Sequence, residues 1–161
     1  MNVQEKPLEV LVGELLIAGG LHLAVAESCT GGLIGHLITN VPGSSSYYLG
    51  SVTAYANQAK VRLLGVAPTT LEQYGAVSAE TVIEMARGIR QVLSAEVGLA
   101  VSGIAGPDGG TPEKPVGLVW IGLSAPGLEQ AWHYLWPGDR LQVKEQTARQ
   151  ALHLLVDYLE R

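Results

Sequence analysis

Apolar side chains recur along the chain with helical spacing in some segments and as short continuous runs in others. Between residues 8 and 16 they return every three or four positions, which predicts an amphipathic helix that Gly19 and Gly20 end. Residues 21–26 form an apolar run of strand length, and a helical stripe over residues 33–40 follows a glycine-containing turn. The chain therefore begins with a helix, a strand, a tight turn and a second helix.

The same patterns predict four more strands and four more helices. The strands are expected at residues 47–55, 97–104, 116–123 and 130–136, and the helices at residues 57–64, 68–74, 78–93 and 139–159. Asn57 and Ser78 are candidate N-caps, and Pro68 suits the first turn of a helix. Glycine and proline mark loops at residues 41–45 and 106–115.

The order of these elements indicates an α/β fold. Helices alternate with strands in the first half of the chain, which favours a parallel core with helices on both faces. Three strands follow one another near the end, and their short connections require antiparallel pairing. We therefore expect one domain over residues 1–161, a three-layer α/β/α sandwich with a mixed, mostly parallel sheet of about five strands.

Composition narrows the class of protein. Hydrophobic residues make up 47% of the 161 residues and charged residues 16%, which is typical of a folded domain. The net charge of -5 argues against a general nucleic-acid surface but allows a local pocket for a small anion. The one cysteine excludes an internal disulfide, and the four histidines lack metal-ligand spacing, so we expect no metal and no cofactor. Neither a signal peptide nor a membrane span is recognisable, which favours a cytoplasmic location.

The turn over residues 28–32, Ser-Cys-Thr-Gly-Gly, is the first candidate for chemistry. It follows a strand and opens a helix, the place where ligands bind in open α/β sheets. Free N–H groups and the positive helix end suit a phosphate or an oxyanion there. The alternative is an ordinary turn capped by a hydroxyl.

Lys60 is the second candidate, because it falls in the first turn of the helix that begins near Asn57. The positive helix end and partial burial both disfavour an ammonium ion, so the two effects would lower the pKa of Lys60. The helix end supplies only about 1 kcal/mol, so desolvation must supply most of the effect. The alternative is a solvated surface lysine.

Two further segments contain polar or glycine-rich patterns. Residues 102–111 follow an apolar strand and could wrap a ligand with main-chain groups, or form a mobile connection in which Asp108 stabilises a turn. Arg140 and Lys144 lie one helical turn apart and could bind an anion. Alternatively, Asp139 caps the helix and the two bases are solvated.

These segments together resemble the CinA C-terminal domain family, also called PncC, in its free-standing form. The matching stretches are AESCTGG (26–32), PGSS (42–45), YANQAK (55–60), GAVS (75–78), SGIAGPDGG (102–110), KPVG (114–117) and GDR (138–140). Each is short, but they occur in the family's order over nearly the whole chain.

The resemblance implies hydrolysis of nicotinamide mononucleotide to nicotinate mononucleotide and ammonia, without a metal. It implies Ser28 as nucleophile, Lys60 as base and Tyr55 beside them. The substrate contacts that it implies are Cys29, Thr30, Gly31, Gly32, Ser44, Ser45, Ser102, Gly103, Ala105, Gly106 and Arg140. It also implies a homo-oligomer, a dimer, with the nucleotide as its small-molecule partner.

Several alternatives remain open at this point. Cys29 is a rival nucleophile, since a thiolate is intrinsically more reactive than a hydroxyl. Lys144 stands where the family often has an arginine. Full-length relatives carry an N-terminal domain associated with ADP-ribose pyrophosphatase activity, which we do not expect here. The chain could instead be a non-catalytic regulatory module that binds a pyridine nucleotide, or an amidase for another carboxamide such as nicotinamide riboside.

Overall fold

The computed structural model describes residues 6–161 as six α-helices and five strands. The helices are α1 (Leu8–Gly19), α2 (Leu33–Thr39), α3 (Asn57–Leu64), α4 (Pro68–Tyr74), α5 (Ala79–Leu93) and α6 (Arg140–Leu159). The strands are β1 (Leu23–Glu27), β2 (Tyr48–Thr53), β3 (Val97–Gly103), β4 (Leu118–Ala125) and β5 (Leu128–Leu135). A short 3₁₀ helix, η1 (Ser44–Ser46), precedes β2.

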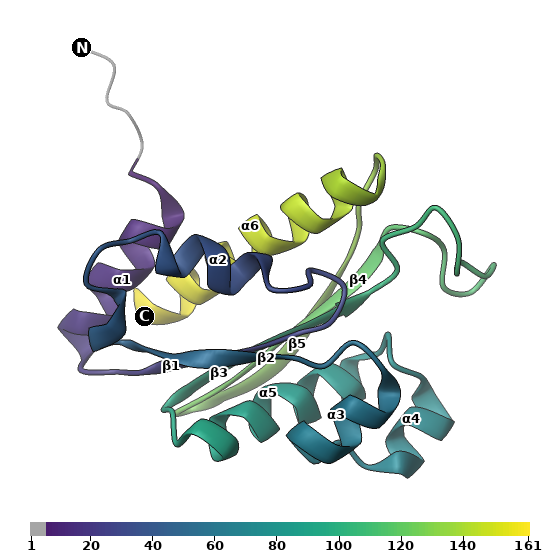
Figure 1. Cartoon of the computed structure of the whole chain (residues 1–161), viewed down its shortest axis with the longest axis horizontal. Helices are drawn as coiled ribbons and strands as arrows, with labels where there is room; N and C mark the ends of the chain where they lie inside the picture. Colours follow the sequence, from purple (N-terminus) through teal and green to yellow (C-terminus); the bar gives the residue numbers. More distant parts are fainter. Residues whose placement is uncertain (1–5) are drawn as a thin grey trace.

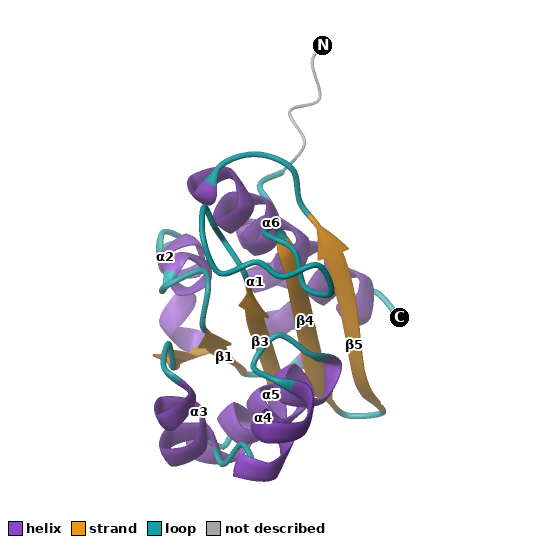
Figure 2. Ribbon diagram, turned by 90° about the vertical axis from the view of Figure 1, so that its right-hand side faces the viewer, coloured by secondary structure: helices purple, strands orange, loops and turns teal. Residues whose placement is uncertain are grey.

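The strands form one sheet in the order β2-β1-β3-β4-β5. Strands β2 and β3 both pair with β1 in parallel, β4 is antiparallel to β3, and β5 is antiparallel to β4. Helices α1, α2 and α6 cover one face of the sheet, and α3, α4 and α5 cover the other (Figures 1 and 2). The expected α/β/α sandwich with a mixed five-stranded sheet is confirmed.

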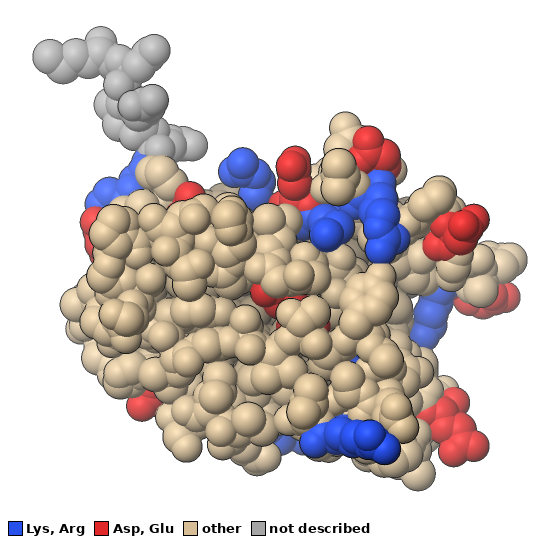
Figure 3. Space-filling model, viewed as in Figure 1, with Lys and Arg blue, Asp and Glu red and all other residues tan. Residues whose placement is uncertain are grey.

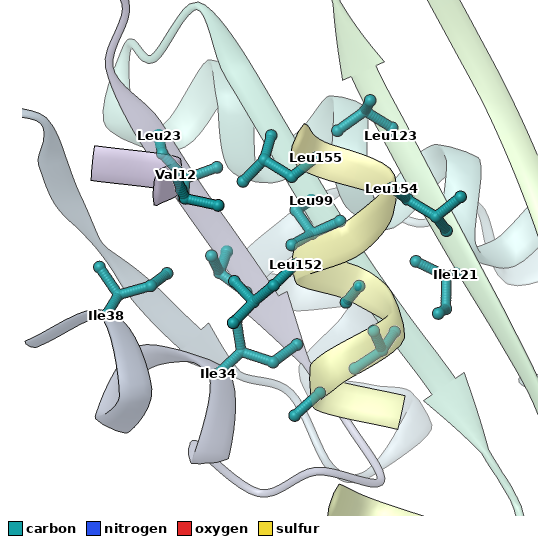
Figure 4. Packing of buried hydrophobic residues seen from close by; sticks show 14 of the residues in the cluster. Val12, Leu23, Ile34, Ile38, Leu99, Ile121, Leu123, Leu152, Leu154 and Leu155 are labelled. Atoms are coloured by element: carbon teal, nitrogen blue, oxygen red, sulfur yellow. The ribbon is translucent and has the colours of Figure 1, made fainter. Parts of the chain in front are cut away.

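Strand β1, which lies between β2 and β3, is buried on both faces, and its side chains alternate between two cores. Leu23 and Val25 join the larger core beneath α1, α2 and α6, whereas Ala24 and Ala26 face α5. Figure 4 shows Leu23 beside Val12, and Leu99 beside Leu152 and Leu155 of α6, in the larger core. Each such aliphatic side chain contributes about 1.5–3 kcal/mol when fully buried.

Small residues on the other face allow the backbone of α5 to lie close to the sheet. A Cβ atom on Gly98 would lie 2.1 Å from the carbonyl oxygen of Ala86, and one on Gly122 would lie 2.6 Å from that of Val82. These distances leave no room for any side chain. Helix α5 therefore packs directly on β3 and β4.

The helix caps agree with the predictions in part. The Oγ atom of Ser78 accepts a hydrogen bond from the N–H of Thr81 at 3.2 Å, so Ser78 is the N-cap of α5 as predicted. The prediction for Asn57 is wrong: Asn57 is the first residue of α3, and Ala56 occupies the cap position without a side-chain bond. Asn57 is therefore free to face the pocket described below.

Candidate active site

Ser28 follows β1 directly, at the carboxyl end of this strand. Its N–H donates to the carbonyl oxygen of Val101 at 3.1 Å, which continues the β1–β3 ladder by one residue. The chain then turns into α2, so the Ser28 side chain lies where a parallel sheet opens toward a ligand.

Lys60 lies beside Ser28 and is almost completely buried. Its Nζ atom is 3.0 Å from the Ser28 Oγ atom, 3.0 Å from the carbonyl oxygen of Ala54 and 3.0 Å from that of Tyr55. Only 1% of the residue is exposed. A neutral amine has two N–H groups and one lone pair. If its two N–H groups donate to the two carbonyls, its lone pair faces the Ser28 hydroxyl.

Burial lowers the pKa of Lys60, because removal from water penalises the ammonium ion. A Cys29 thiolate would oppose this effect and raise the pKa of Lys60. Burial, however, raises the pKa of the Cys29 thiol to about 12. Cys29 is therefore uncharged at neutral pH, and desolvation of Lys60 acts without that opposition.

The same surroundings distinguish the two candidate nucleophiles. Desolvation is the largest cause of the raised pKa of Cys29, and the nearby charge of Glu27 adds to it. A protonated thiol is a weak nucleophile, and it is the Ser28 hydroxyl that contacts the amine. The structure thus favours Ser28 over Cys29 on both geometry and charge.

A pocket of about 220 Å³ opens next to this pair. Its lining residues come from the turn after β1, the start of α3, the segment between α4 and α5, the end of β3 and the start of α6. They are Ser28, Cys29, Tyr55, Asn57, Lys60, Ala76, Val77, Ser102, Gly103, Ala105 and Arg140. Asn57, Ala76 and Val77 were not among the expected site residues, although the YANQAK and GAVS stretches contain them.

Arg140 connects three of these elements at the pocket wall. Its Nη2 atom donates to the Tyr55 hydroxyl at 2.9 Å, and its Nη1 atom donates to the carbonyl oxygen of Gly106 at 2.5 Å. The Tyr55 hydroxyl is thus bound by Arg140, and it is the Tyr55 carbonyl that contacts Lys60. Gly106 supports the wall through its carbonyl and does not line the pocket.

Gly31 and Gly32 lie outside the pocket lining, and Gly31 lies beside the basic side chain of Lys144. Gly31 and Gly32 have φ values of 61° and 106°, a backbone conformation that favours glycine. The Nζ atom of Lys144 lies 3.8 Å from the position a Cβ atom on Gly31 would take. The lysine that stands at the family's arginine position therefore reaches the turn that holds the nucleophile.

Three expected substrate contacts, Thr30, Ser44 and Ser45, are placed elsewhere by the structure. Thr30 is 1% exposed, and its hydroxyl donates to the Glu27 carboxylate at 2.5 Å, so it faces the protein interior. Ser44 and Ser45 lie in η1, next to the amino ends of β1 and β2. Helix α2 returns the chain to the amino ends of the parallel strands before β2 begins. Ser28 follows the opposite end of β1, so the length of this strand, about 16 Å, separates Ser44 and Ser45 from Ser28.

Within residues 6–161, no three side chains of His, Cys, Asp or Glu gather in a way that would hold a metal ion. None of the helices in this part of the chain combines the length and apolar character needed to cross a bilayer.

The fold and site define an α/β/α protein with a buried serine–lysine pair at the carboxyl end of β1. The chain belongs to the CinA C-terminal domain family, whose model matches residues 5–159.

Its relatives are named CinA-like proteins or putative competence-damage inducible proteins. A CinA-like protein of Desulfosudis oleivorans is 62% identical over 78% of this chain and 30% of its own length. A CinA-like protein of Salinibacter ruber is 49% identical over 90% of this chain and 35% of its own length. The chain thus spans 30% and 35% of the lengths of these two relatives.

Solved structures share the fold over the whole domain. The competence damage-inducible protein A (ComA) of Klebsiella pneumoniae is 34% identical with a TM-score of 0.92, and 96% of each chain is covered. The competence/damage inducible protein CihA of Agrobacterium tumefaciens is 36% identical with a TM-score of 0.87, and 100% of each chain is covered.

Proposed function

We propose that this domain is a nicotinamide-nucleotide amidase that hydrolyses nicotinamide mononucleotide to nicotinate mononucleotide and ammonia. The observation that carries the proposal is the 3.0 Å contact between the buried Lys60 Nζ atom and the Ser28 Oγ atom. Lowering of the Lys60 pKa by burial increases the fraction of neutral amine, the form that can accept a proton.

The first half of the reaction forms an acyl-enzyme. Lys60 accepts the hydroxyl proton of Ser28 while the Ser28 oxygen attacks the carboxamide carbon, which gives a tetrahedral oxyanion. The N–H groups of Cys29 and Thr30 take no part in the main-chain hydrogen bonds among the described residues, whereas the N–H of Gly31 donates to the Ser28 carbonyl. The first two are therefore the candidate oxyanion donors, and one such donor is worth about 3 kcal/mol.

The second half returns the enzyme to its starting state. The Lys60 ammonium gives its proton to the amide nitrogen, the C–N bond breaks, and ammonia leaves. Neutral Lys60 then takes a proton from water, the resulting hydroxide attacks the acyl carbon, and the Ser28 oxygen leaves and recovers the proton. The carboxylate product is released.

The basic side chains near the pocket suggest how the nucleotide is oriented. Arg140 lines the pocket wall and Lys144 reaches the turn at Gly31, so we propose that the substrate phosphate lies between them. Figure 3 shows basic side chains over α6 with acidic side chains beside them, above a central area of the face that carries few charges. Phosphate oxygens form strong charge-assisted hydrogen bonds with such groups.

An assay of ammonia release tests the assignment of the nucleophile. With nicotinamide mononucleotide as substrate, we expect Ser28→Ala to lose all but about 0.1% of the activity, since the attacking group is gone. Cys29→Ala is the matched control, and it should keep most of the activity because its thiol stays protonated. Active Ser28→Ala together with inactive Cys29→Ala would reverse the assignment.

The base is tested by Lys60→Arg. Arginine keeps a positive charge at every accessible pH, so it cannot accept the Ser28 proton, and ammonia release should fall to background. Turnover by this variant at the rate of the unaltered protein would exclude Lys60 as the base.

The substrate is tested by a comparison of nicotinamide mononucleotide, nicotinamide riboside and nicotinamide. We expect the phosphorylated compound to have the highest kcat/KM. Faster ammonia release from the riboside would indicate a different carboxamide substrate. Binding of the nucleotide without any release of ammonia would indicate a regulatory module instead of an enzyme.

A further inference from the structure

Glu27 is a fully buried carboxylate directly before the nucleophile. It forms no salt bridge within residues 6–161. Its Oε1 atom accepts hydrogen bonds from the Thr30 hydroxyl at 2.5 Å and the Ile34 N–H at 2.9 Å, and its Oε2 atom accepts from the Gly35 N–H at 3.1 Å. A carboxylate is costly to bury unless its oxygens are hydrogen-bonded, so these three bonds keep it in one position.

These bonds close the turn that carries Ser28. Glu27 ends β1, and the N–H groups of Ile34 and Gly35 lie in the first turn of α2. The carboxylate therefore ties the two ends of the segment 28–33 to one another. Thr30, in the middle of the segment, is held by the same side chain.

The surroundings allow this carboxylate little movement. A Cβ atom on Gly35 would lie 2.7 Å from the Tyr48 hydroxyl, 3.2 Å from the Ser51 Oγ atom and 3.6 Å from the Glu27 Oε2 atom. The absence of a side chain on Gly35 thus leaves space for the carboxylate and for Tyr48, and little space beyond that.

We infer that Glu27 is a positioning residue, whose carboxylate holds the Ser28 hydroxyl against Lys60 and aims the N–H groups of Cys29 and Thr30 at the reacting carbonyl. The inference rests on the proposed function in that Ser28 is the nucleophile. Glu27 itself faces α2 and does not line the pocket. A displacement of about 1 Å at a reacting group costs about 100-fold in rate, so a small movement of this turn has a large effect.

The chain provides a matched control at the start of another helix. The Glu84 carboxylate accepts a hydrogen bond from the Ala67 N–H at 2.9 Å and from the Thr70 hydroxyl at 2.6 Å. It thus binds a main-chain N–H and a threonine hydroxyl at the beginning of α4, as Glu27 does at α2. Glu84 does not line the pocket.

The experiment compares Glu27→Gln with Glu84→Gln by steady-state kinetics of ammonia release and by thermal unfolding. In Glu27→Gln one carboxylate oxygen becomes an NH₂ group. This group faces the N–H of Gly35 or of Ile34, and two donors cannot bond, so one hydrogen bond to α2 is lost and the turn shifts. We expect kcat to fall about 10- to 100-fold while KM changes by less than about three-fold. Glu84→Gln, which alters a partly buried carboxylate with two hydrogen bonds, should lower the unfolding temperature by a smaller amount and leave kcat within about two-fold.

A reagent that attacks serine separates this inference from the proposed function. A fluorophosphonate forms a bond between the Ser28 oxygen and phosphorus, fluoride leaves, and Lys60 takes the serine proton. Mass spectrometry with Ser28→Ala as the blank gives the rate of labelling without any carboxamide. A protein that labels at Ser28 but releases no ammonia contradicts the amidase proposal, and the inference then stands if Glu27→Gln labels about 10-fold more slowly or worse.

Thr30 supplies a second test that does not depend on Glu27→Gln folding. Thr30→Val removes one of the three hydrogen bonds at nearly constant shape, and Thr30→Ser retains the hydroxyl. We expect the valine variant to lose at least about five-fold in kcat and in labelling rate, and the serine variant to recover most of both. Full turnover and labelling in Glu27→Gln or Thr30→Val overturns the inference, and a protein that neither labels nor turns over overturns both proposals.

Discussion

The buried amine of Lys60 affects stability as well as chemistry. Its folded-state pKa is lowered by desolvation, so between that value and the ordinary lysine value the unfolded chain binds more protons than the folded protein. A rise in pH through this range therefore stabilises the folded protein. The cost of burying the amine is fully present below the folded-state pKa and is lost as the pH approaches the ordinary lysine value.

This linkage gives a prediction for Lys60→Met, which keeps an unbranched side chain without the titrating group. The free energy of unfolding of the unaltered protein should rise relative to that of the variant as the pH increases from 7 to 9, by at most about 1.4 kcal/mol per pH unit. Urea unfolding of both proteins at each pH measures the difference. A difference that stays constant over this range would show that burial does not lower the pKa of the Lys60 amine into it.

At the scale of elements, the start of α6 sets one wall of the pocket. Asp139 and Gln142 form a capping box in which the Asp139 carboxylate accepts from the Gln142 N–H at 2.9 Å and the Gln142 side chain accepts from the Asp139 N–H at 2.8 Å. Arg140 is the next residue, and its guanidinium group donates to the Tyr55 hydroxyl and to the Gly106 carbonyl oxygen. The capping box therefore fixes the backbone position of Arg140 at the start of α6.

The two hydrogen bonds of the Arg140 guanidinium group predict that Arg140→Lys is not a conservative change. A lysine cannot make both bonds in the same plane, so the loop at Gly106 and the proposed phosphate contact are both weakened. We expect KM for nicotinamide mononucleotide to rise about tenfold or more, and KM for nicotinamide riboside to change little. Tyr55→Phe, which removes only one bond, should have a smaller effect. An equal rise in KM for both substrates would place the phosphate elsewhere.

Much of this arrangement of elements was predictable from local patterns. The alternation of helices and strands gave the parallel half of the sheet, and the short connections after residue 103 gave the antiparallel half. The carboxyl end of the first strand also indicated where Ser28 would lie. These inferences succeed because apolar spacing and turn residues act within a few positions of one another.

The errors concern choices that only tertiary contacts decide. Thr30 has the side chain of a ligand contact, but a buried carboxylate three residues earlier takes its hydroxyl. Ser44 and Ser45 belong to a stretch that matches the family, but α2 returns the chain to the amino ends of β1 and β2, opposite the end where Ser28 lies. Nothing in the residue pattern near Lys60 shows that the carbonyls of Ala54 and Tyr55 would bind its amine.

At the scale of the whole molecule, the site opposes the overall charge. The chain has a net charge of -5, yet Arg140 and Lys144 lie beside the pocket. These two side chains would attract the phosphate of the proposed substrate. Salt weakens an attraction between partly exposed charges, since the screening length falls to about 8 Å at 0.15 M ionic strength.

The balance of charges therefore predicts a salt dependence that identifies the phosphate site. Raising the ionic strength from about 0.02 M to about 0.2 M should increase KM for nicotinamide mononucleotide several-fold and leave KM for nicotinamide riboside nearly constant. Lys144→Gln should raise KM for the mononucleotide at low salt and flatten its dependence on salt. Lys6→Gln, which alters an exposed pair with Glu14 on α1, is the matched control for charge. If both variants keep the original salt dependence, Lys144 does not bind the phosphate, and the attraction comes from other groups around the pocket.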